Sequence, residues 1–382
     1  MLYSILDSLR KTSERAKEDR HRSIIKFIAQ AYLGIADSSD DDFNRLKSFA
    51  EKIENNHVMY AENKKLLEND VKKWYAEQGG GWSAELTNSI VDNVYSVLTL
   101  SDADYRRTIL GRKLNVEFNR QINNVFNDGE ANISLDNGKQ RADIVVGNNA
   151  VKFFEANFEY KSSLVYIDNP FVLDEISNSA SMYTKRLTSH KDELIKQLSL
   201  DNQNKNVFEE LVVSKNMEYI QQKLRNICHG DIIRDNNSDW QYKLNNSEKN
   251  INVNSLSAGL KTFVILKQLI LSGTLGRGSC VILDEPEIHL HPEWQLVFAE
   301  LIVLLCKEFK LDIVLNTHSP YFLNAIEVYS AKHGITDACR YYLSRNEGDF
   351  SYIDDVTDDV EQIYKKLARP LQILEDVRYN DV

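Results

Sequence analysis

The sequence of 382 residues has no apolar run near the length of about 20 residues that spans a bilayer. Its start, MLYSILDSLRKTSERAKEDR, mixes apolar residues with acidic and basic ones, unlike a signal peptide. The four cysteines lie far apart and form no CxxC pair, so we expect free thiols in a reducing compartment. These absences favour a cytoplasmic protein that has no membrane partner. The cysteines are Cys228, Cys280, Cys306 and Cys339.

Basic residues are fewer than acidic ones, 46 against 57, and the formal net charge is −11. This balance argues against a chain that is basic throughout for binding nucleic acid, but it allows a local basic face. Arg106, Arg107, Arg112 and Lys113 form a small basic cluster. The cluster fits either a phosphate contact with DNA or an ordinary solvated end of a helix.

In the first half of the sequence, the spacing of apolar residues changes near residue 110. Before it, prolines are absent and apolar residues recur at helical spacing, which predicts a helical lobe over residues 1–110 with a break at residues 78–81. After it, residues 131–135 and 142–146 flank an Asp-Asn-Gly turn, a pattern typical of a β-hairpin. Strands are expected to continue over residues 152–158 and 163–167, which makes residues 111–170 a β-rich segment.

Helical spacing returns over residues 172–227, and we predict a helical insertion over residues 171–235. Polar residues at 235–238 and 245–248 indicate loops and short strands. In the C-terminal segment, residues 236–382, the apolar runs 281–283 and 313–315 are separated by a predicted helix over residues 293–309. This pattern predicts an α/β fold with parallel core strands buried on both faces and a crossover helix between them.

Three motifs in the last third of the sequence carry polar residues. The first, NSLSAGLK at residues 254–261, leads into an amphipathic helix. If Ser257 caps that helix, free backbone N–H groups and the positive end of the helix dipole favour an anion there, and Gly259 permits a close backbone approach. The same residues also fit an ordinary serine-capped helix.

The second motif, CVILDEPEIHLHP, occupies residues 280–292. It begins with a short apolar strand, and two acidic residues follow that strand directly. Ligands of open α/β sheets bind at the carboxyl ends of the strands, so Asp284 can hold Mg²⁺ and Glu285 can polarise a water molecule. The alternative is an acidic turn after a strand. His289 and His291 are spaced as a zinc pair could be, but no third and fourth ligand is evident.

The third motif, IVLNTHSP, occupies residues 313–320 and again ends an apolar strand in polar residues. It predicts that His318 lies at the same sheet edge as Asp284 and Glu285. A histidine there can bind a terminal phosphate or orient an attacking water molecule, although a lone histidine also occurs for structural reasons.

In this order and spacing the motifs resemble the signature, Walker B and H-loop motifs of ABC-type ATPases. The forms DEPEIHLHP and THSP resemble the RecF, SMC and OLD-like branch, which is often labelled AAA family ATPases and includes antiviral defence and DNA repair proteins. The segment LSAGL differs from the LSGGQ of transporter subunits. The resemblance is strong over residues 250–345 and looser near 165–170 and 361–368. It implies an ABC-ATPase-like sheet with parallel core strands, an antiparallel β-hairpin region and large helical insertions.

The resemblance also implies roles for individual residues, with ATP and Mg²⁺ as the cofactors. Asp284 would support Mg²⁺, Glu285 would be the catalytic base and His318 would sense the γ-phosphate. Residues 287–291 would form a loop across the seam with a second subunit, which is either a second copy or an ATPase partner. The signature that touches the γ-phosphate held by that subunit would comprise Ser257, Ala258 and Gly259.

ABC-type ATPases also need a Gly-x-x-x-x-Gly-Lys-Ser/Thr loop that cradles the phosphates, and the sequence contains none. The helix implied by residues 1–6 resembles the one that follows this loop. Either the working protein carries an upstream strand and phosphate loop, which we favour, or the chain is a half-site that lends its signature to a complete partner.

Two function classes follow from these observations. One is an ATP hydrolase whose dimerisation on ATP drives a DNA-directed or antiviral defence effector. Because the stretch after His318 is too short for a fused OLD-type nuclease domain, any nuclease is expected to be a separate chain. The other is a regulatory or scaffold subunit that does not hydrolyse ATP. The missing phosphate loop favours the second class, and the joint presence of Ser257, Asp284, Glu285 and His318 favours the first.

We predict that a protein made of these 382 residues binds ATP weakly, because no phosphate loop offsets the charges of Asp284 and Glu285. Isothermal titration of the purified protein with ATP measures this directly. An affinity in the micromolar range would contradict the prediction.

Overall fold

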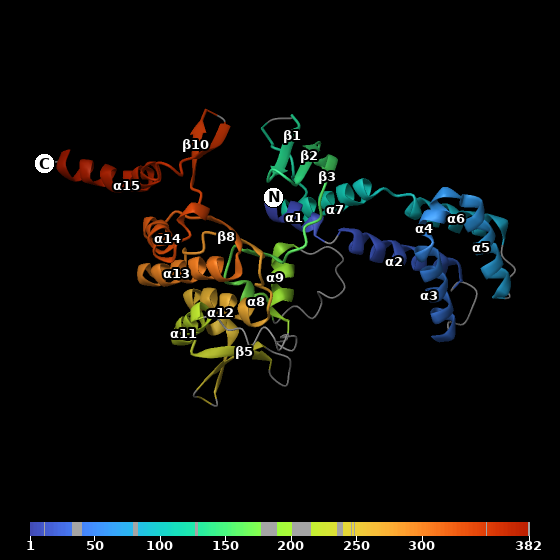
Figure 1. Ribbon diagram of the computed structural model, residues 1–382, viewed down its shortest axis with the longest axis horizontal. Coiled ribbons are helices and arrows are strands. Elements are labelled where there is room, and N and C mark those ends of the chain that lie inside the picture. Colours follow the sequence, from blue (N-terminus) through green and yellow to red (C-terminus); the bar gives the residue numbers. More distant parts are fainter. Residues whose placement is uncertain are drawn as a thin grey trace. The chain divides into compact units, whose positions relative to one another are not determined.

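The chain forms two compact units, Met1–Lys161 and Ser162–Val382, and each is described by itself. Figure 1 shows the computed structural model with its helices and strands labelled. None of the described helices is both long and apolar enough to cross a membrane. The structure describes residues 1–10, 12–32, 40–78, 83–126, 129–176, 189–200, 215–234, 240–245, 247, 249–348 and 350–380.

The first unit begins with helices, as the apolar spacing predicts. Several are capped by a side chain that accepts from a backbone N–H of the first turn: Asn63 before α5, Ser83 before α6 and Ser101 before α7. The apolar faces of α2 to α6 meet in one core. The helices are α1 (Leu2–Leu9), α2 (Thr12–Tyr32), α3 (Asp40–Asn55), α4 (His57–Glu62), α5 (Lys64–Glu77), α6 (Ala84–Leu98) and α7 (Asp102–Glu117).

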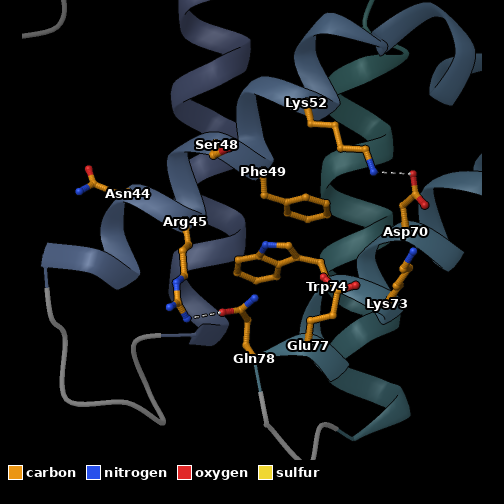
Figure 2. Close-up of a pocket in the computed structure, with 10 residues that line it drawn as sticks. All are labelled: Asn44, Arg45, Ser48, Phe49, Lys52, Asp70, Lys73, Trp74, Glu77 and Gln78. Atoms are coloured by element: carbon orange, nitrogen blue, oxygen red, sulfur yellow. Dashed lines mark hydrogen bonds and ion pairs between the residues drawn. The ribbon is translucent and has the colours of Figure 1, made fainter.

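A hollow lies between α3 and α5 of this unit (Figure 2). The rings of Phe49 and Trp74 stack at its base with centroids 4.8 Å apart. On the rim, Lys52 of α3 reaches Asp70 of α5 at 3.3 Å, and Arg45 donates to Gln78 at 3.4 Å. These contacts join the two helices, and the charges on the rim are of both signs.

The predicted hairpin is present and belongs to a three-stranded antiparallel sheet of the order β1-β2-β3. Gly138 in its turn has a φ of 83°, a conformation that a glycine adopts without strain. One face of the sheet packs with apolar residues of α1 and α7. The strands are β1 (Ala131–Asp136), β2 (Arg141–Gly147) and β3 (Ala150–Ala156).

A buried carboxylate joins α1 to its neighbours in this unit. The side chain of Asp7 is 4% exposed and pairs with Arg15 at 3.2 Å, with Arg10 at 3.7 Å and with Lys113. Burial pushes the pKa of Asp7 upward, but the charges of Lys113, Arg15 and Arg10 outweigh it and hold this pKa below its usual value.

Most of the basic cluster that sequence analysis offers for DNA binding is engaged within the chain. Arg106 donates to the carbonyl of Ala156 at 2.8 Å, and Arg107 pairs with Asp104 at 2.7 Å. Lys113 pairs with Asp7. A DNA contact at this cluster therefore stays a prediction that rests chiefly on Arg112, which is exposed.

The second unit contains the predicted parallel sheet, in the order β4-β8-β9, with α13 as the crossover from β8 to β9. These findings confirm the α/β class. The elements are β4 (Leu164–Ile167), β8 (Cys280–Asp284), α13 (Pro292–Phe309) and β9 (Asp312–Asn316).

The expectation that both β8 and β9 are buried on both faces is wrong for β9. Ile313 and Leu315 pack against the core, but Val314 between them is 48% exposed. The physical reason is that successive side chains of a strand point to opposite faces, so Val314 points away from the core that Ile313 and Leu315 contact. One of its faces is therefore open.

The remaining elements of the second unit surround this sheet or extend from it. The helices are α8 (Val172–Glu175), α9 (His190–Leu198), α11 (Lys215–Ile227), η3 (Val253–Ser255), α12 (Ala258–Leu271), α14 (Pro320–His333), η4 (Thr336–Ala338) and α15 (Glu361–Asn380). The strands are β5 (Gly230–Arg234), β6 (Trp240–Leu244), β7 (Asn250–Asn252), β10 (Tyr342–Glu347) and β11 (Phe350–Asp355).

Several sequence expectations lie outside the described residues. They are the break at residues 79–81, the helical spacing over residues 177–188 and 201–214, and the polar residues 235–238, 246 and 248. The four predicted segments, 1–110, 111–170, 171–235 and 236–382, stay a prediction.

We expect Asp7→Asn to lower the free energy of unfolding at pH 7 by roughly 3 kcal/mol, because it leaves three cations at a buried site without their anion. A carboxyl with a depressed pKa in the folded state stabilises the fold above about pH 4 and loses this contribution as the pH falls through its folded pKa. The variant should therefore lose less stability than the parent when the pH falls below about 4.

Urea denaturation at a series of pH values checks this prediction. Asp92→Asn is the control, because the exposed pair of Asp92 with Lys64 should contribute less than about 1 kcal/mol. Equal acid sensitivity in Asp7→Asn and the parent would contradict the expected role of Asp7.

Candidate functional site

Polar side chains from adjacent strands meet at the carboxyl edge of the parallel sheet. Asp284 ends β8 and Asn316 ends β9, and the two are register partners. The Asn316 amide donates to Asp284 Oδ1 at 2.6 Å, and its oxygen accepts from the backbone N–H of Glu285 at 2.8 Å. From the other side, the Tyr166 hydroxyl of β4 donates to Asp284 Oδ2 at 3.1 Å. Each carboxylate oxygen of Asp284 is thus held by a different neighbouring strand.

Glu285 and His318 lie together at this edge, where sequence analysis placed them. His318 Nε2 is 3.3 Å from Glu285 Oε1, and the His318 side chain is 81% exposed. Glu285 has a φ of 43°, in the left-handed region that a non-glycine residue rarely adopts. The bond from its N–H to Asn316 helps to hold this strained conformation, which is of the kind that concentrates at functional sites.

Glu287 is an anchor that sequence analysis did not identify as one. It is 5% exposed, and its Oε1 accepts from the Thr317 hydroxyl and from the backbone N–H of His318 at 3.0 Å. The loop after β8 is thereby fastened to the turn after β9. The backbone of His318 is fixed while its ring stays open to solvent.

The start of α12 carries the signature residues. Ser257 caps the helix by accepting from the N–H of Leu260 at 3.4 Å, as predicted. A Cβ on Gly259 would lie 3.1 Å from the carbonyl oxygen of His289, so a glycine permits this close approach. At Gly259, the signature segment therefore lies close to the loop after β8. Among the described residues, no hydrogen bond joins this segment to Asp284, Glu285 or His318.

Lys261 holds the segment that precedes Ser257, and sequence analysis did not identify this role. It is 1% exposed and donates to the carbonyl of Asn254 at 3.1 Å. It also forms an ion pair with Asp174 of α8 at 2.5 Å and lies over the ring of Phe171 at 5.0 Å. A lysine within an otherwise apolar helix was the available signal, but the sequence alone does not identify its partner.

The two histidines of the second motif have local contacts. His291 caps α13, with its Nδ1 accepting from the N–H of Glu293 at 3.4 Å. The ring of His289 meets that of Phe171 edge-on at 5.3 Å. In the described ranges, no group of three or more His, Cys, Asp or Glu side chains is arranged to hold a metal ion.

The donor set at the edge nevertheless fits Mg²⁺ carried by a nucleotide. Mg²⁺ keeps several waters and takes one or two carboxylates together with substrate phosphates, and does not need a cage of protein ligands. Asp284 offers an oriented carboxylate, and Glu285 follows it directly. The observation that supports this fit is that Tyr166 and Asn316 each donate a hydrogen bond to a different oxygen of Asp284.

The second unit is an α/β unit whose parallel sheet carries acids at its carboxyl edge, the edge at which open α/β sheets bind their ligands. Residues 11–323 match the family described as AAA ATPase domain. Because this match spans more than half of the chain, the protein belongs to that family of ATPase domains.

Among solved structures, the chain is similar to the SMC head domain from Thermotoga maritima. The two are 13% identical, the match covers 59% of this chain and 73% of that chain, and the TM-score is 0.32. At this score the likeness supports no inference about the site.

We expect Lys261→Met to lower the free energy of unfolding by about 1 to 3 kcal/mol. The methionine fills a similar volume, but the carbonyl of Asn254 and the carboxylate of Asp174 lose their cation. Urea denaturation measures the loss, and the exposed Lys243→Met is the control from the same unit. A change no larger than that of the control would show that the Lys261 contacts do not stabilise the loop before Ser257.

Proposed function

We propose that this chain is an ATP-binding and hydrolysing engine of the RecF, SMC and OLD-like type. The supporting observation is the group at the carboxyl edge of the sheet. There the Asp284 carboxylate is oriented from both sides, and His318 lies 3.3 Å from the Glu285 carboxylate. Membership of the ATPase-domain family agrees with nucleotide binding at this edge.

In this proposal Asp284 holds Mg²⁺ that arrives with the nucleotide, and Glu285 accepts the proton of the attacking water. When bound, Mg²⁺ neutralises charge on the phosphates. His318 contacts the terminal phosphate and orients Glu285 through the Nε2 to Oε1 contact. The exposure of its ring leaves it accessible to a phosphate.

Ser257, Ala258 and Gly259 are proposed to contact the phosphate of a nucleotide held by a second subunit. The support is that they form the N-terminus of a helix, where backbone N–H groups and the dipole favour an anion, and that Ser257 is exposed. Ile288, 62% exposed in the neighbouring loop, is then at the seam of an ATP-dependent dimer.

The phosphate cradle is proposed to come from residues other than those of this sequence, in an upstream segment or in a partner. In the described part of the sheet, the outer side of β9 has no neighbouring strand. A strand that carries a phosphate loop could pair there, next to Asn316 and His318. We propose that ATP-dependent dimerisation drives a DNA-directed or antiviral defence effector, and that any nuclease is a separate chain.

The second candidate is a regulatory or scaffold subunit that lends its signature to a complete ATPase and does not hydrolyse ATP. The absence of a Gly-x-x-x-x-Gly-Lys-Ser/Thr motif favours it. Such a subunit would still require Ser257 for its signature, but Glu285 and His318 would have no role in catalysis.

Glu285→Gln separates the two candidates once a phosphate loop is supplied by the native partner or a longer protein. The variant keeps the shape but cannot accept a proton, so phosphate release should fall at least about a hundredfold. An ATP-bound dimer should accumulate, and light scattering during gel filtration with ATP measures it.

Glu293→Gln, at an exposed acid early in α13, is the matched control and should hydrolyse ATP at the parent rate. Unchanged phosphate release and assembly in Glu285→Gln would support the scaffold and overturn the hydrolase.

A further inference from the structure

Tyr166 lies near the carboxyl end of β4, beside β8. It pairs in register with Ile282 of β8, and its hydroxyl reaches forward to Asp284, two residues further along that strand. On the opposite side, Asn316 of β9 holds the other oxygen of the same carboxylate. The carboxylate is therefore gripped between two side chains from the strands that flank its own.

The ring of Tyr166 is itself held in place. It packs against the imidazole of His190 with centroids 4.5 Å apart and a tilt of 32°. His190 Nε2 lies 3.1 Å from Asp168 Oδ2, just after the end of β4. His190 is the first residue of α9, where Ser189 and Asp192 form a capping box. Asp284, Tyr166, His190 and Asp168 thus form one continuous chain of contacts.

Packing alone does not account for this arrangement. A phenylalanine would fill the same space beside His190, but it would lack the hydroxyl that donates to Asp284. Half-buried polar groups such as Asp168 and His190 are costly next to an apolar sheet unless they are paired. Their pairing fixes the imidazole, and the imidazole fixes the ring that carries the hydroxyl.

We propose that Tyr166 is a positioning residue for Asp284, and that His190 and Asp168 fix the ring of Tyr166. The metal part of this inference rests on the proposed function, in which Asp284 holds Mg²⁺. A carboxylate oxygen has two lone pairs. With one pair on each oxygen engaged by Tyr166 or Asn316, the carboxylate keeps one orientation and still presents a free pair to a metal or its water.

The first test is the conformation of Asp284 in crystals of the Tyr166→Phe protein. The inference expects the carboxylate to turn away from its parent position or to occupy two positions, with the Phe ring still against His190. Tyr242→Phe is the matched control, because it removes a buried hydroxyl of the same unit from β6, outside the sheet that carries Asp284. An Asp284 carboxylate unmoved in Tyr166→Phe would overturn the inference, whatever the fate of the proposed function.

The second test is the affinity for Mn²⁺ alone, followed by the electron paramagnetic resonance signal of the free ion. Tyr166→Phe should weaken binding about tenfold, in the range typical of residues that orient a metal ligand. Its thermal midpoint should stay within about 3 °C of the parent, which separates positioning from loss of fold. Tyr242→Phe should bind Mn²⁺ as the parent does.

Asp284→Asn tells the two proposals apart. If it weakens Mn²⁺ binding and Tyr166→Phe does not, the positioning role fails and the metal site stands. If Asp284→Asn has no effect on Mn²⁺, the metal role of Asp284 fails, and the crystal structure alone decides whether Tyr166 positions the carboxylate. His190→Phe, which keeps a ring but loses the pair with Asp168, should reproduce part of the Tyr166→Phe effect.

Discussion

The candidate site depends on the bridge that Asn316 makes between two parallel strands. One amide group donates to the Asp284 carboxylate and accepts from the N–H of Glu285. The second bond supports the backbone of Glu285, which has a φ of 43° just after the end of β8. Because the strands are in parallel register, the same bridge sets the distance between the turns that carry Glu285 and His318. A shift of register would separate all of these groups.

Buried charged side chains stabilise the loops that carry the exposed residues His318 and Ser257. Glu287 holds the turn of His318, and Lys261 holds the segment before Ser257. Glu300, 3% exposed on α13, does the same for helices, because it pairs with Lys223 of α11 and with Lys332 of α14 at 3.0 Å. Burial alone would raise the pKa of Glu300, and the two lysines outweigh it and hold this pKa below its usual value. A buried charge without its partner is costly, so each pair disfavours other positions of its loop or helix.

The part of the site that could be predicted from the sequence is the set of residues at the carboxyl ends of the parallel strands. Apolar runs that stop at Asp284 and before His318 are local signals, and parallel strands bring their carboxyl ends to one edge. Tyr166 and Lys261 could not be found in this way. Tyr166 lies 118 residues from Asp284, and the partner of Lys261 is Asp174 on α8, at the start of the predicted helical insertion. The burial of β9 was mispredicted for a related reason, because an apolar run does not reveal which elements cover each face of the strand.

The contrast between open reactive groups and buried anchors has a consequence for the proposed chemistry. A histidine that is 81% exposed and 3.3 Å from a carboxylate gains little from that contact in water. The same pair interacts far more strongly once a ligand and a second protein surface exclude water, because the effective dielectric constant falls. Glu287 is already buried and holds the backbone of His318 in place without a ligand. In the proposed function, the geometry of the edge is therefore set before a nucleotide arrives, and closure against a second subunit would change the strength of the Glu285 and His318 interaction.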